Sequence, residues 1–321
     1  MASASVFTRV SVPEMRRFGY KARITVGVVA GSSVLGMLIP PNVMLILYAI
    51  VAEQSIGEMF IAGVVPGIIL SFAYGIAIIS MAYQFPNFVG SQISGRDVED
   101  EGYSLTLGQI FVKIFPILLL VVLVLGGIYG GVFTPTEAGA AGAFAALIIA
   151  AIKRKLTWSG LWGVLVEIGY ITAAILFLLI AASMYRRMLG VAALPTIFGD
   201  WLKALGMGYA GIMALYVILL VILGTILDTA SIILIVVPLF MLVLEPYGIN
   251  LVWFGIVTVI GAEIGLLTQP LGISCFTIKS TINDPTISLN DIFSGAFPFA
   301  VVMLGVLILV IVFPVLSLVL I

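Results

Sequence analysis

The stretch GSSVLGMLIPPN, residues 31–42, decides the fold, because it interrupts a long hydrophobic segment with a glycine five residues before a proline. A second stretch, GAEIGLLTQPLG at residues 261–272, has the same spacing and is also flanked by apolar sequence. A bilayer tolerates broken helix backbone only where the freed N–H and C=O groups face protein or a polar cavity. Paired breaks of this kind indicate a substrate and ion site near the midplane of a transporter.

The composition indicates an all-α polytopic membrane protein. Hydrophobic residues make up 62% of the 321 residues and charged residues 9%, whereas a soluble domain carries about a quarter charged residues. The 14 Lys and Arg balance 15 Asp and Glu, which gives no indication of nucleic-acid binding. The chain has no histidine and one cysteine, Cys275. These absences argue against haem, zinc, iron–sulfur clusters and disulfides, so we expect no cofactor.

Hydrophobic stretches that suit a bilayer crossing, which takes about 20 residues, recur along the chain. They cover residues 24–51 (broken), 59–83, 110–132, 138–152, 170–184, 213–245 (a re-entrant pair), 251–278 (broken) and 292–321. As one continuous helix, residues 24–51 would extend about 42 Å, beyond a hydrocarbon core of about 30 Å. A break near Pro40 and Pro41 resolves this excess.

The basic residues predict the orientation, because loops rich in Lys and Arg lie on the cytoplasmic side. Two basic clusters, residues 16–23 and 153–155, are separated by an even number of predicted crossings and so share the cytoplasmic side. Residues 84–109 form the longest polar stretch and are predicted to be a solvated linker. Arg186 and Arg187 fall on the outer side, where we expect a solvated loop.

Residues 213–245 are too long for one crossing and short for two, and their apolar sequence pauses at GTILDTAS. Two half-helices that meet at a polar tip fit this length. Inside a membrane, the backbone of such a tip needs polar partners, and Asp228, Thr229 and Ser231 are available there.

The features around the second break repeat those around the first in the same order. In each copy a polar tip (residues 3–8 and 228–231) precedes a helix with proline, a glycine turn, the broken segment, an acidic helix start and a crossing with proline. The two breaks run in opposite directions by the crossing count, so we expect inverted repeats. Nothing ahead of the first tip matches the sequence that precedes the second. Since no signal peptide is evident either, we expect an N-terminally truncated form of a larger fold.

Six motifs in order resemble one known family. They are SVPEMRRFGY, VLGMLIPPN, SIGEMFIAGVVPG, GIYGGVFTPTEAGAAGAF, LDTASIILIVVPLF and EIGLLTQPLG. Over essentially the whole chain they look like the large membrane subunit of tripartite ATP-independent periplasmic (TRAP) transporters, called DctM-like. One departure is Gln269, which stands where the family usually has the first proline of TPPVG. A second is that family members carry further residues ahead of the first tip.

The resemblance implies an inverted-repeat, elevator-type secondary transporter of the ion transporter superfamily, driven by a sodium gradient. It implies import of organic acids, such as C4-dicarboxylates, sialic acid or similar carboxylates, across the bacterial inner membrane. The implied partners are a small four-helix membrane subunit and a periplasmic substrate-binding protein. The implied division is a first transport part at 1–83, a cytoplasmic linker at 84–109, scaffold helices at 110–209 and a second transport part at 210–321.

The candidate binding residues are those that supply oxygen atoms at the breaks and tips, because sodium prefers several oxygen ligands and unwound carbonyls provide them. The first predicted site comprises Ser3, Ser5, Gly36, Pro40, Pro41 and Asn42, and the second comprises Asp228, Thr229, Gly265, Thr268, Gln269 and Pro270. Gln269 either adds a ligand or caps a freed carbonyl. The alternative for these glycines and prolines is that they only kink ordinary helices.

Two glutamates are candidates for structural support. Glu263 either accepts N–H groups freed at the second break or tunes the ion site, and we favour the structural role. Glu137 follows Thr134 and Pro135 at the start of a crossing, where it is expected to cap the helix. Because neither broken stretch contains Arg or Lys, we expect sodium and helix ends to supply the positive charge that attracts a carboxylate substrate.

Two other interpretations compete with a working transporter. A membrane-embedded enzyme would need paired or clustered aspartates, yet Asp228 is the only aspartate well inside an apolar stretch. We therefore predict that the chain is not an enzyme. It also lacks a phosphate-binding glycine–lysine loop, so an ATP-driven pump is excluded and the energy must come from an ion gradient or another subunit. The remaining alternative is an inactive fragment or one piece of a split transporter.

Overall fold

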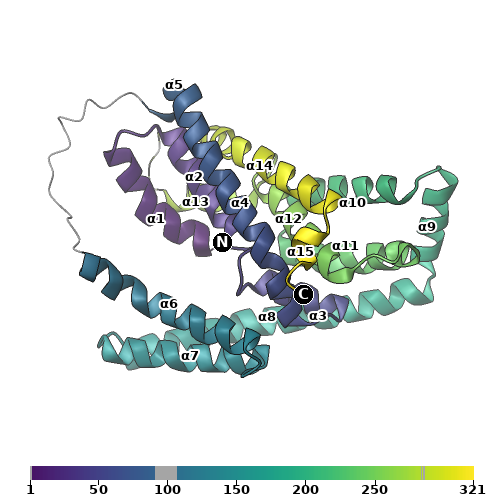
Figure 1. Ribbon diagram of the computed structural model, residues 1–321, viewed down its shortest axis with the longest axis horizontal. Coiled ribbons are helices and arrows are strands. Elements are labelled where there is room, and N and C mark those ends of the chain that lie inside the picture. The colour runs from purple at the N-terminus through teal and green to yellow at the C-terminus, as the bar shows by residue number, and fades with distance from the viewer. Residues whose placement is uncertain (1, 91–106, 283, 285) are drawn as a thin grey trace. The chain divides into compact units, whose positions relative to one another are not determined.

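The computed structural model describes residues 2–90, 107–282, 284 and 286–321, and its regular elements in this part are helices (Figure 1). The expectation of an all-α protein is therefore confirmed. Most of the predicted linker at 84–109 lies outside the described residues. At its two ends, α4 (Ile56–Gln84) is followed by the short helix α5 (Pro86–Val89), and α6 begins at Leu107.

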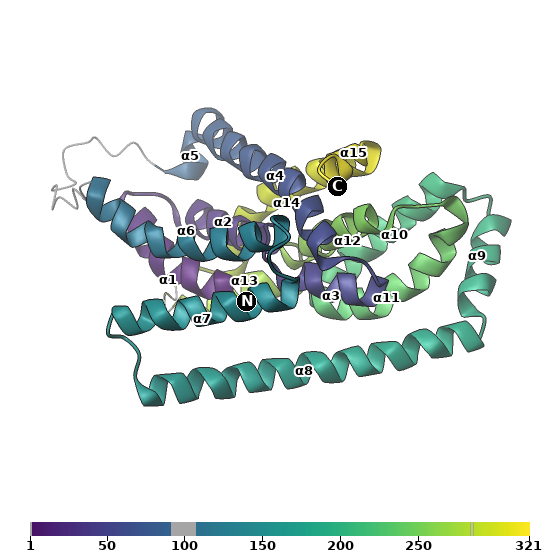
Figure 2. The same cartoon turned by 60° about the horizontal axis from the view of Figure 1, so that its bottom comes forward.

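The chain forms two compact units. The second unit, Glu99–Ala181, contains α6 (Leu107–Tyr129), α7 (Pro135–Ile152) and the larger part of α8 (Trp158–Val191). In this unit α6 and α7 pack side by side (Figure 2). A capping box starts α7, because the Thr134 hydroxyl accepts the Glu137 N–H at 3.3 Å and Glu137 Oε2 accepts the Thr134 N–H at 2.8 Å.

The first unit, Met1–Val98 with Ala182–Ile321, contains the two predicted breaks. Besides α4 and α5, its helices are α1 (Ala2–Arg17), α2 (Ala22–Leu35), α3 (Val43–Ala52), α9 (Leu194–Ala204), α10 (Tyr209–Gly224), α11 (Thr229–Leu244), α12 (Leu251–Leu266), α13 (Ile273–Thr281), α14 (Leu289–Val312) and α15 (Val315–Leu318), with a 3-10 turn η1 (Glu245–Tyr247). Its core is built around α12, in which every residue from Val252 to Leu266 is buried.

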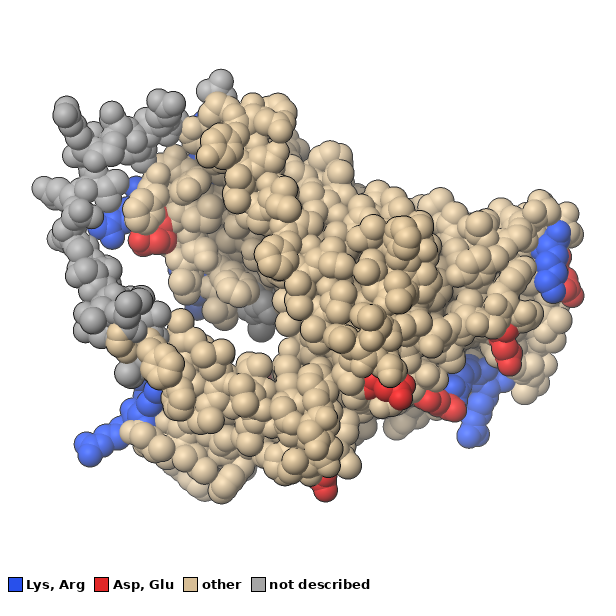
Figure 3. Space-filling view, viewed as in Figure 1, with Lys and Arg blue, Asp and Glu red and all other residues tan. Residues whose placement is uncertain are grey.

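Five helices of the described part are long and apolar enough to cross a membrane, or up to six if the pair α9 and α10, bent by 117°, counts as one span. The five are α4, α7, α8, α11 with η1, and α14. Uncharged residues cover most of the face in Figure 3. The chain is thus a multi-pass membrane protein.

The helices α1 to α4 and α11 to α14 follow the same order. Each set begins with a 16-residue helix that contains a proline, and a glycine in the left-handed region follows (Gly19, φ 76°; Gly248, φ 64°). Next come two short helices separated by a break, and then a long helix whose N-cap is a serine, Ser55 or Ser288. The sets also exchange contacts: α2 packs on α14 and α12 on α4, while α1 packs on α13 and α11 on α3.

The predicted hairpin at residues 213–245 is present as α10 and α11, which are 16 residues each and joined by residues 225–228. One prediction about polar residues is wrong. Arg186 and Arg187 lie in α8, not in a solvated loop, because they stand among good helix formers such as Ala182, Met184 and Met188. The Arg186 guanidinium instead pairs with Glu53 Oε1 at 2.5 Å. Residues 3–8, predicted as a polar tip, belong to α1.

Gly27 of α2 and Gly295 of α14 allow their two helices to touch backbone to backbone. A Cβ atom on Gly27 would overlap the carbonyl oxygen of Gly295, and a Cβ on Gly295 would lie 3.1 Å from the Cα of Gly27. Such small-residue contacts are typical of helix interfaces in membranes. The packing of α2 on α14 therefore requires these two glycines.

Gly27→Val is expected to destabilise the protein by about 1–3 kcal/mol or more, because the obstructing atoms belong to backbone that cannot rotate away. The measurement is the thermal unfolding midpoint of the purified protein in detergent. Gly75→Ala is the matched control, since a Cβ on Gly75 of α4 meets nothing within 4 Å. Equal midpoints for the two variants would contradict the tight α2–α14 contact.

Candidate functional site

The first break lies between α2 and α3. Beyond Leu35 the backbone makes one more turn, in which the carbonyl of Leu35 accepts N–H groups at 3.1 and 3.2 Å. Pro40 and Pro41 follow and have no N–H to donate. Asn42 then caps α3, because its Oδ1 accepts the Met44 N–H at 2.7 Å. The Nδ2 of the buried Asn42 has no hydrogen-bond partner among the residues that the structure describes, so an unused donor is present at this break.

The second break lies between α12 and α13. The Thr268 N–H and hydroxyl both donate to the Gly265 carbonyl at 3.0 Å. Gln269 and Pro270 are exposed. The Pro40–Pro41 and Gln269–Pro270 peptide bonds are both cis. The break thus presents a hydroxyl, an amide and helix-end backbone at one place in the chain.

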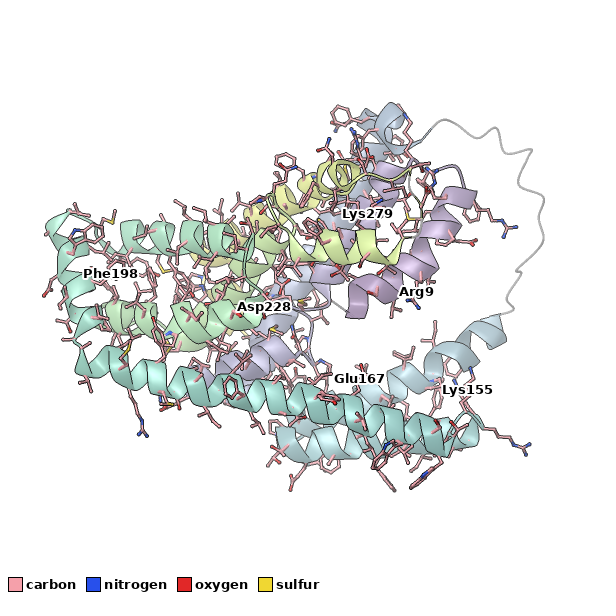
Figure 4. All side chains as sticks on the ribbon, turned by 180° about the vertical axis from the view of Figure 1, so that it is seen from behind. Arg9, Lys155, Glu167, Phe198, Asp228 and Lys279 are labelled. Carbon is pink, nitrogen blue, oxygen red and sulfur yellow. The ribbon has the colours of Figure 1, made fainter. Side chains whose placement is uncertain are left out.

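Asp228 lies at the turn between α10 and α11 (Figure 4). One carboxylate oxygen accepts the Ala230 N–H at 3.2 Å, and the other accepts the Ser231 hydroxyl at 2.5 Å. The side chain therefore acts as the N-cap of α11. Its two oxygens retain lone pairs for a further ligand.

Thr229, the first residue of α11, connects the hairpin tip to the broken helix. Its hydroxyl donates to Glu263 Oε1 at 2.8 Å. Glu263 is completely buried, and its Oε2 has no hydrogen-bond partner within the described part of the chain. Close approach of α10 and α12 brings these groups together, since a Cβ on Gly224 would lie 2.9 Å from the Cα of Gly265.

Ser5 of α1 is placed against the far end of α13. Its Oγ accepts the Thr281 hydroxyl at 3.2 Å. Ser3 also lies in α1, but its side chain is outside the described part. Among the described residues no hydrogen bond joins Ser5 to the first break. The assignment of Ser3 and Ser5 to a sodium site remains a prediction.

The structure therefore brings together some of the predicted residues and separates others. Thr229 meets Glu263, and Thr268 meets Gly265 within the second break. Glu137 belongs to the second unit, where it caps α7. The residues of the first break are linked to those of the second by the packing of α2 on α14 and α12 on α4.

A pocket of about 430 Å³ opens at the second break. Thr268, Gln269 and Leu267 line one side, and α14 supplies Phe293, Ser294 and Phe297. The sequence reasoning missed the α14 residues. The capping box of Ser288 and Asp291 was a usable signal. It fixes where α14 begins after the break, and therefore which side of that helix faces the break.

In the described residues no group of three His, Cys, Asp or Glu side chains could hold a metal. The ion pairs of this part are Arg23 with Asp291, Arg186 with Glu53, and Lys203 with Asp200. The acidic groups at the hairpin tip have no basic partner among them.

Thr229→Val is expected to destabilise the protein by about 1–3 kcal/mol, because it removes the hydrogen bond of a buried carboxyl group. The thermal midpoint of the purified protein measures the loss. Thr277→Val is a matched control, since among the described residues that hydroxyl bonds only the carbonyl of Ile273 in its own helix. If the two variants lose the same stability, the Thr229–Glu263 contact has no special role in holding the tip.

Comparison with known proteins shows the family to which the chain belongs. The family of the DctM component of tripartite ATP-independent periplasmic transporters matches residues 1–316. The C4-dicarboxylate TRAP transporter large permease protein DctM of Pseudomonas aeruginosa is 31% identical over 318 residues, which are 99% of this chain and 72% of the relative.

Two other relatives are longer. The isethionate TRAP transporter permease protein DctMQ of Oleidesulfovibrio alaskensis is 28% identical over 96% of this chain, and 47% of its own length is covered. The sialic acid TRAP transporter permease protein SiaT of Haemophilus influenzae is 26% identical over 98% of this chain and 49% of its length. The chain thus spans about half the length of these two proteins. It belongs to the DctM family of TRAP transporter large permeases, which are transporter subunits and not enzymes.

Proposed function

We propose that this chain is the large permease subunit of a TRAP transporter that uses a sodium gradient to import an organic acid across the bacterial inner membrane. The observation that carries the proposal is the pair of helices broken in the same way within one compact unit, with the hairpin tip against one of them. Broken helices at membrane depth are stable only where their backbone is enclosed or bound to ligands. A site for ions and substrate gives both breaks a reason to exist.

The proposed architecture is an inverted repeat that works as an elevator. The same order of elements in α1 to α4 and α11 to α14, and the exchange of contacts between the sets, support a pseudo-two-fold relation. Transporters of this kind hold the substrate between such repeats. In the proposal, residues 1–83 and 210–321 move with the substrate against scaffold helices at 110–209.

The proposed substrate class is a carboxylate. Relatives are named for C4-dicarboxylate, sialic acid and 2,3-diketo-L-gulonate, all of which carry carboxylate groups. The unused Nδ2 donor of Asn42 lies at the N-terminus of α3, where the helix ends in partial positive charge. The partial positive charge at the helix N-terminus favours an anion, and the Nδ2 group can donate a hydrogen bond to it.

Sodium is the proposed coupling ion, and the groups present suit it. The second break offers the Thr268 hydroxyl and helix-end carbonyls, while the hairpin tip offers Asp228 and Thr229. The buried Oε2 of Glu263 has no hydrogen-bond partner among the described residues, so it supplies an acceptor for one more positive partner. The proposal also includes two protein partners, a small four-helix membrane subunit and a periplasmic substrate-binding protein.

The function is tested by uptake into liposomes that contain this chain and its proposed partners. An inward sodium gradient is expected to drive uptake of a C4-dicarboxylate or sialic acid, and replacing sodium with potassium is expected to abolish it. Thr268→Val is expected to raise the half-saturating sodium concentration roughly tenfold, or by about 1.4 kcal/mol of binding. Ser280→Ala is the control, because in the described part that hydroxyl bonds only the carbonyl of Thr277 in its own helix. Uptake that is indifferent to sodium would refute the coupling.

Asn42→Asp is expected to weaken substrate binding while it keeps the cap on α3. The carboxylate still accepts the Met44 N–H, but the N–H donor is lost and a negative charge is added. Loss of a hydrogen bond to a charged group costs about 1.5–3 kcal/mol, which corresponds to a KM raised roughly 10- to 100-fold. The measurement is the KM for substrate at saturating sodium. Asn250→Asp, at the N-cap of α12, is the control, and an unchanged KM in Asn42→Asp would remove Asn42 from the site.

A further inference from the structure

Glu263 lies in the most enclosed helix of the first unit. All residues of α12 from Val252 to Leu266 are buried, and Glu263 has none of its surface exposed. An ionised carboxylate in such surroundings loses its hydration, which costs several kcal/mol unless a partner offsets it. A residue of this kind in an apolar helix therefore requires an account of what it binds.

The hydrogen bonds satisfy only one half of the carboxyl group. Oε1 accepts the Thr229 hydroxyl at 2.8 Å, whereas Oε2 is buried and has no hydrogen-bond partner. Asn42 Nδ2 and Ser317 Oγ are the other side-chain atoms of the described part in this condition. Of these three atoms, Glu263 Oε2 alone belongs to an acidic group.

In the described part of the chain, no lysine or arginine pairs with the acidic groups at the hairpin tip. Thr229 follows Asp228 directly, so the contact between Thr229 and Glu263 places two acidic residues around the start of α11. The N-terminus of α11 contributes only about half a positive charge. When both carboxyl groups are ionised, they carry a negative charge that a bound cation would neutralise.

The available ligand atoms suit a small monovalent cation. The Thr229 hydroxyl donates its proton to Oε1 and therefore keeps its lone pairs free. The carbonyl oxygens near the end of α12, such as that of Ile264, accept N–H groups from the turn beyond the helix and keep further lone pairs. The described part offers no third acidic or histidine side chain for a multivalent metal. One carboxylate with hydroxyl and carbonyl oxygens is a donor set for sodium.

We propose that Glu263 binds the coupling cation directly through Oε2, with the Thr229 hydroxyl oxygen beside it. Cation binding then connects the tip of the hairpin to α12, so the ion holds the two elements together as well as neutralising the buried charge. This inference rests on the proposed function, because it assigns a ligand to the sodium site of that transporter. It also gives Glu263 a role beyond support of the broken helix.

A purely structural role makes a different prediction for one substitution. In Glu263→Gln the amide oxygen still accepts the Thr229 hydroxyl, and the side chain keeps its shape. The NH₂ group then occupies the position of Oε2 and faces a cation with positive partial charge. A support residue therefore tolerates this change without altered ion binding, whereas a cation ligand does not.

The experiment measures the thermal midpoint of the purified full chain as a function of sodium, with choline chloride added to constant ionic strength. A ligand that binds only the folded state raises the midpoint with its concentration. Wild-type protein is expected to show this rise. In Glu263→Gln the rise is expected to occur at sodium concentrations roughly tenfold higher or more. In Glu263→Asp the sodium concentration is expected to increase less, because the negative charge remains but lies one methylene further from the site. Glu58→Gln, an exposed acid of α4, is expected to match wild type.

The outcomes separate this inference from the proposed function. If sodium stabilises wild type and Glu263→Gln over the same concentrations, Glu263 is not a ligand, whatever the absolute midpoints, and sodium coupling still stands. If sodium does not stabilise wild type at all, both fail. If Glu263→Gln gives no cooperative transition, Glu263→Asp decides, because a sodium dependence identical to wild type would overturn the assignment.

Discussion

Backbone groups inside a bilayer have no water to bond, so a helix can be interrupted there only if other helices enclose the interruption. Small residues let other helices approach both breaks of this protein. A Cβ on Gly63 of α4 would lie 3.0 Å from the Leu38 carbonyl oxygen at the first break, and Gly224 and Gly265 bring α10 and α12 into backbone contact beside the second. Neighbouring helices thus cover the backbone at the breaks in part, while Ile39 and Gln269 remain exposed. The rest of the candidate site depends on this partial enclosure.

The enclosure also determines which polar atoms remain unused. Most polar side chains near the breaks bond within their own segment, as Thr268 does with Gly265 and Asp228 with Ser231. Asn42 Nδ2 and Glu263 Oε2 do not. One is a donor at the first break, and the other is an acceptor beside the second. A donor suits an anionic substrate and an acceptor suits a cation, so the two halves of the site differ in the charge that they attract.

The sequence was sufficient to predict the elements that depend on local signals. Two breaks, the hairpin and the repeated order of helices follow from Gly and Pro spacing within apolar segments, and these rules act over a few residues. The ends of α8 were not predictable in the same way. Arg186 and Arg187 have the polarity of a loop, and only the contact of Arg186 with Glu53, far away in the chain, shows how a helix accommodates that charge. The same limit applies to Ser5, whose partner Thr281 lies on α13, and to the pocket residues that α14 supplies.

The contacts between the two sets of helices explain how residues from distant parts of the chain can act as one site. Because α1 packs on α13 and α11 on α3, each break is bordered by a helix from the other set. A ligand that tightens one break therefore acts on elements that also border the second. Glu263 occupies a central place in this arrangement, since it lies on α12 and bonds the tip of α11, which in turn packs against α3 beyond the first break. Only α11 therefore separates an ion bound at Glu263 from α3, the helix that Asn42 caps. Ion binding and substrate binding can be coupled through this one helix.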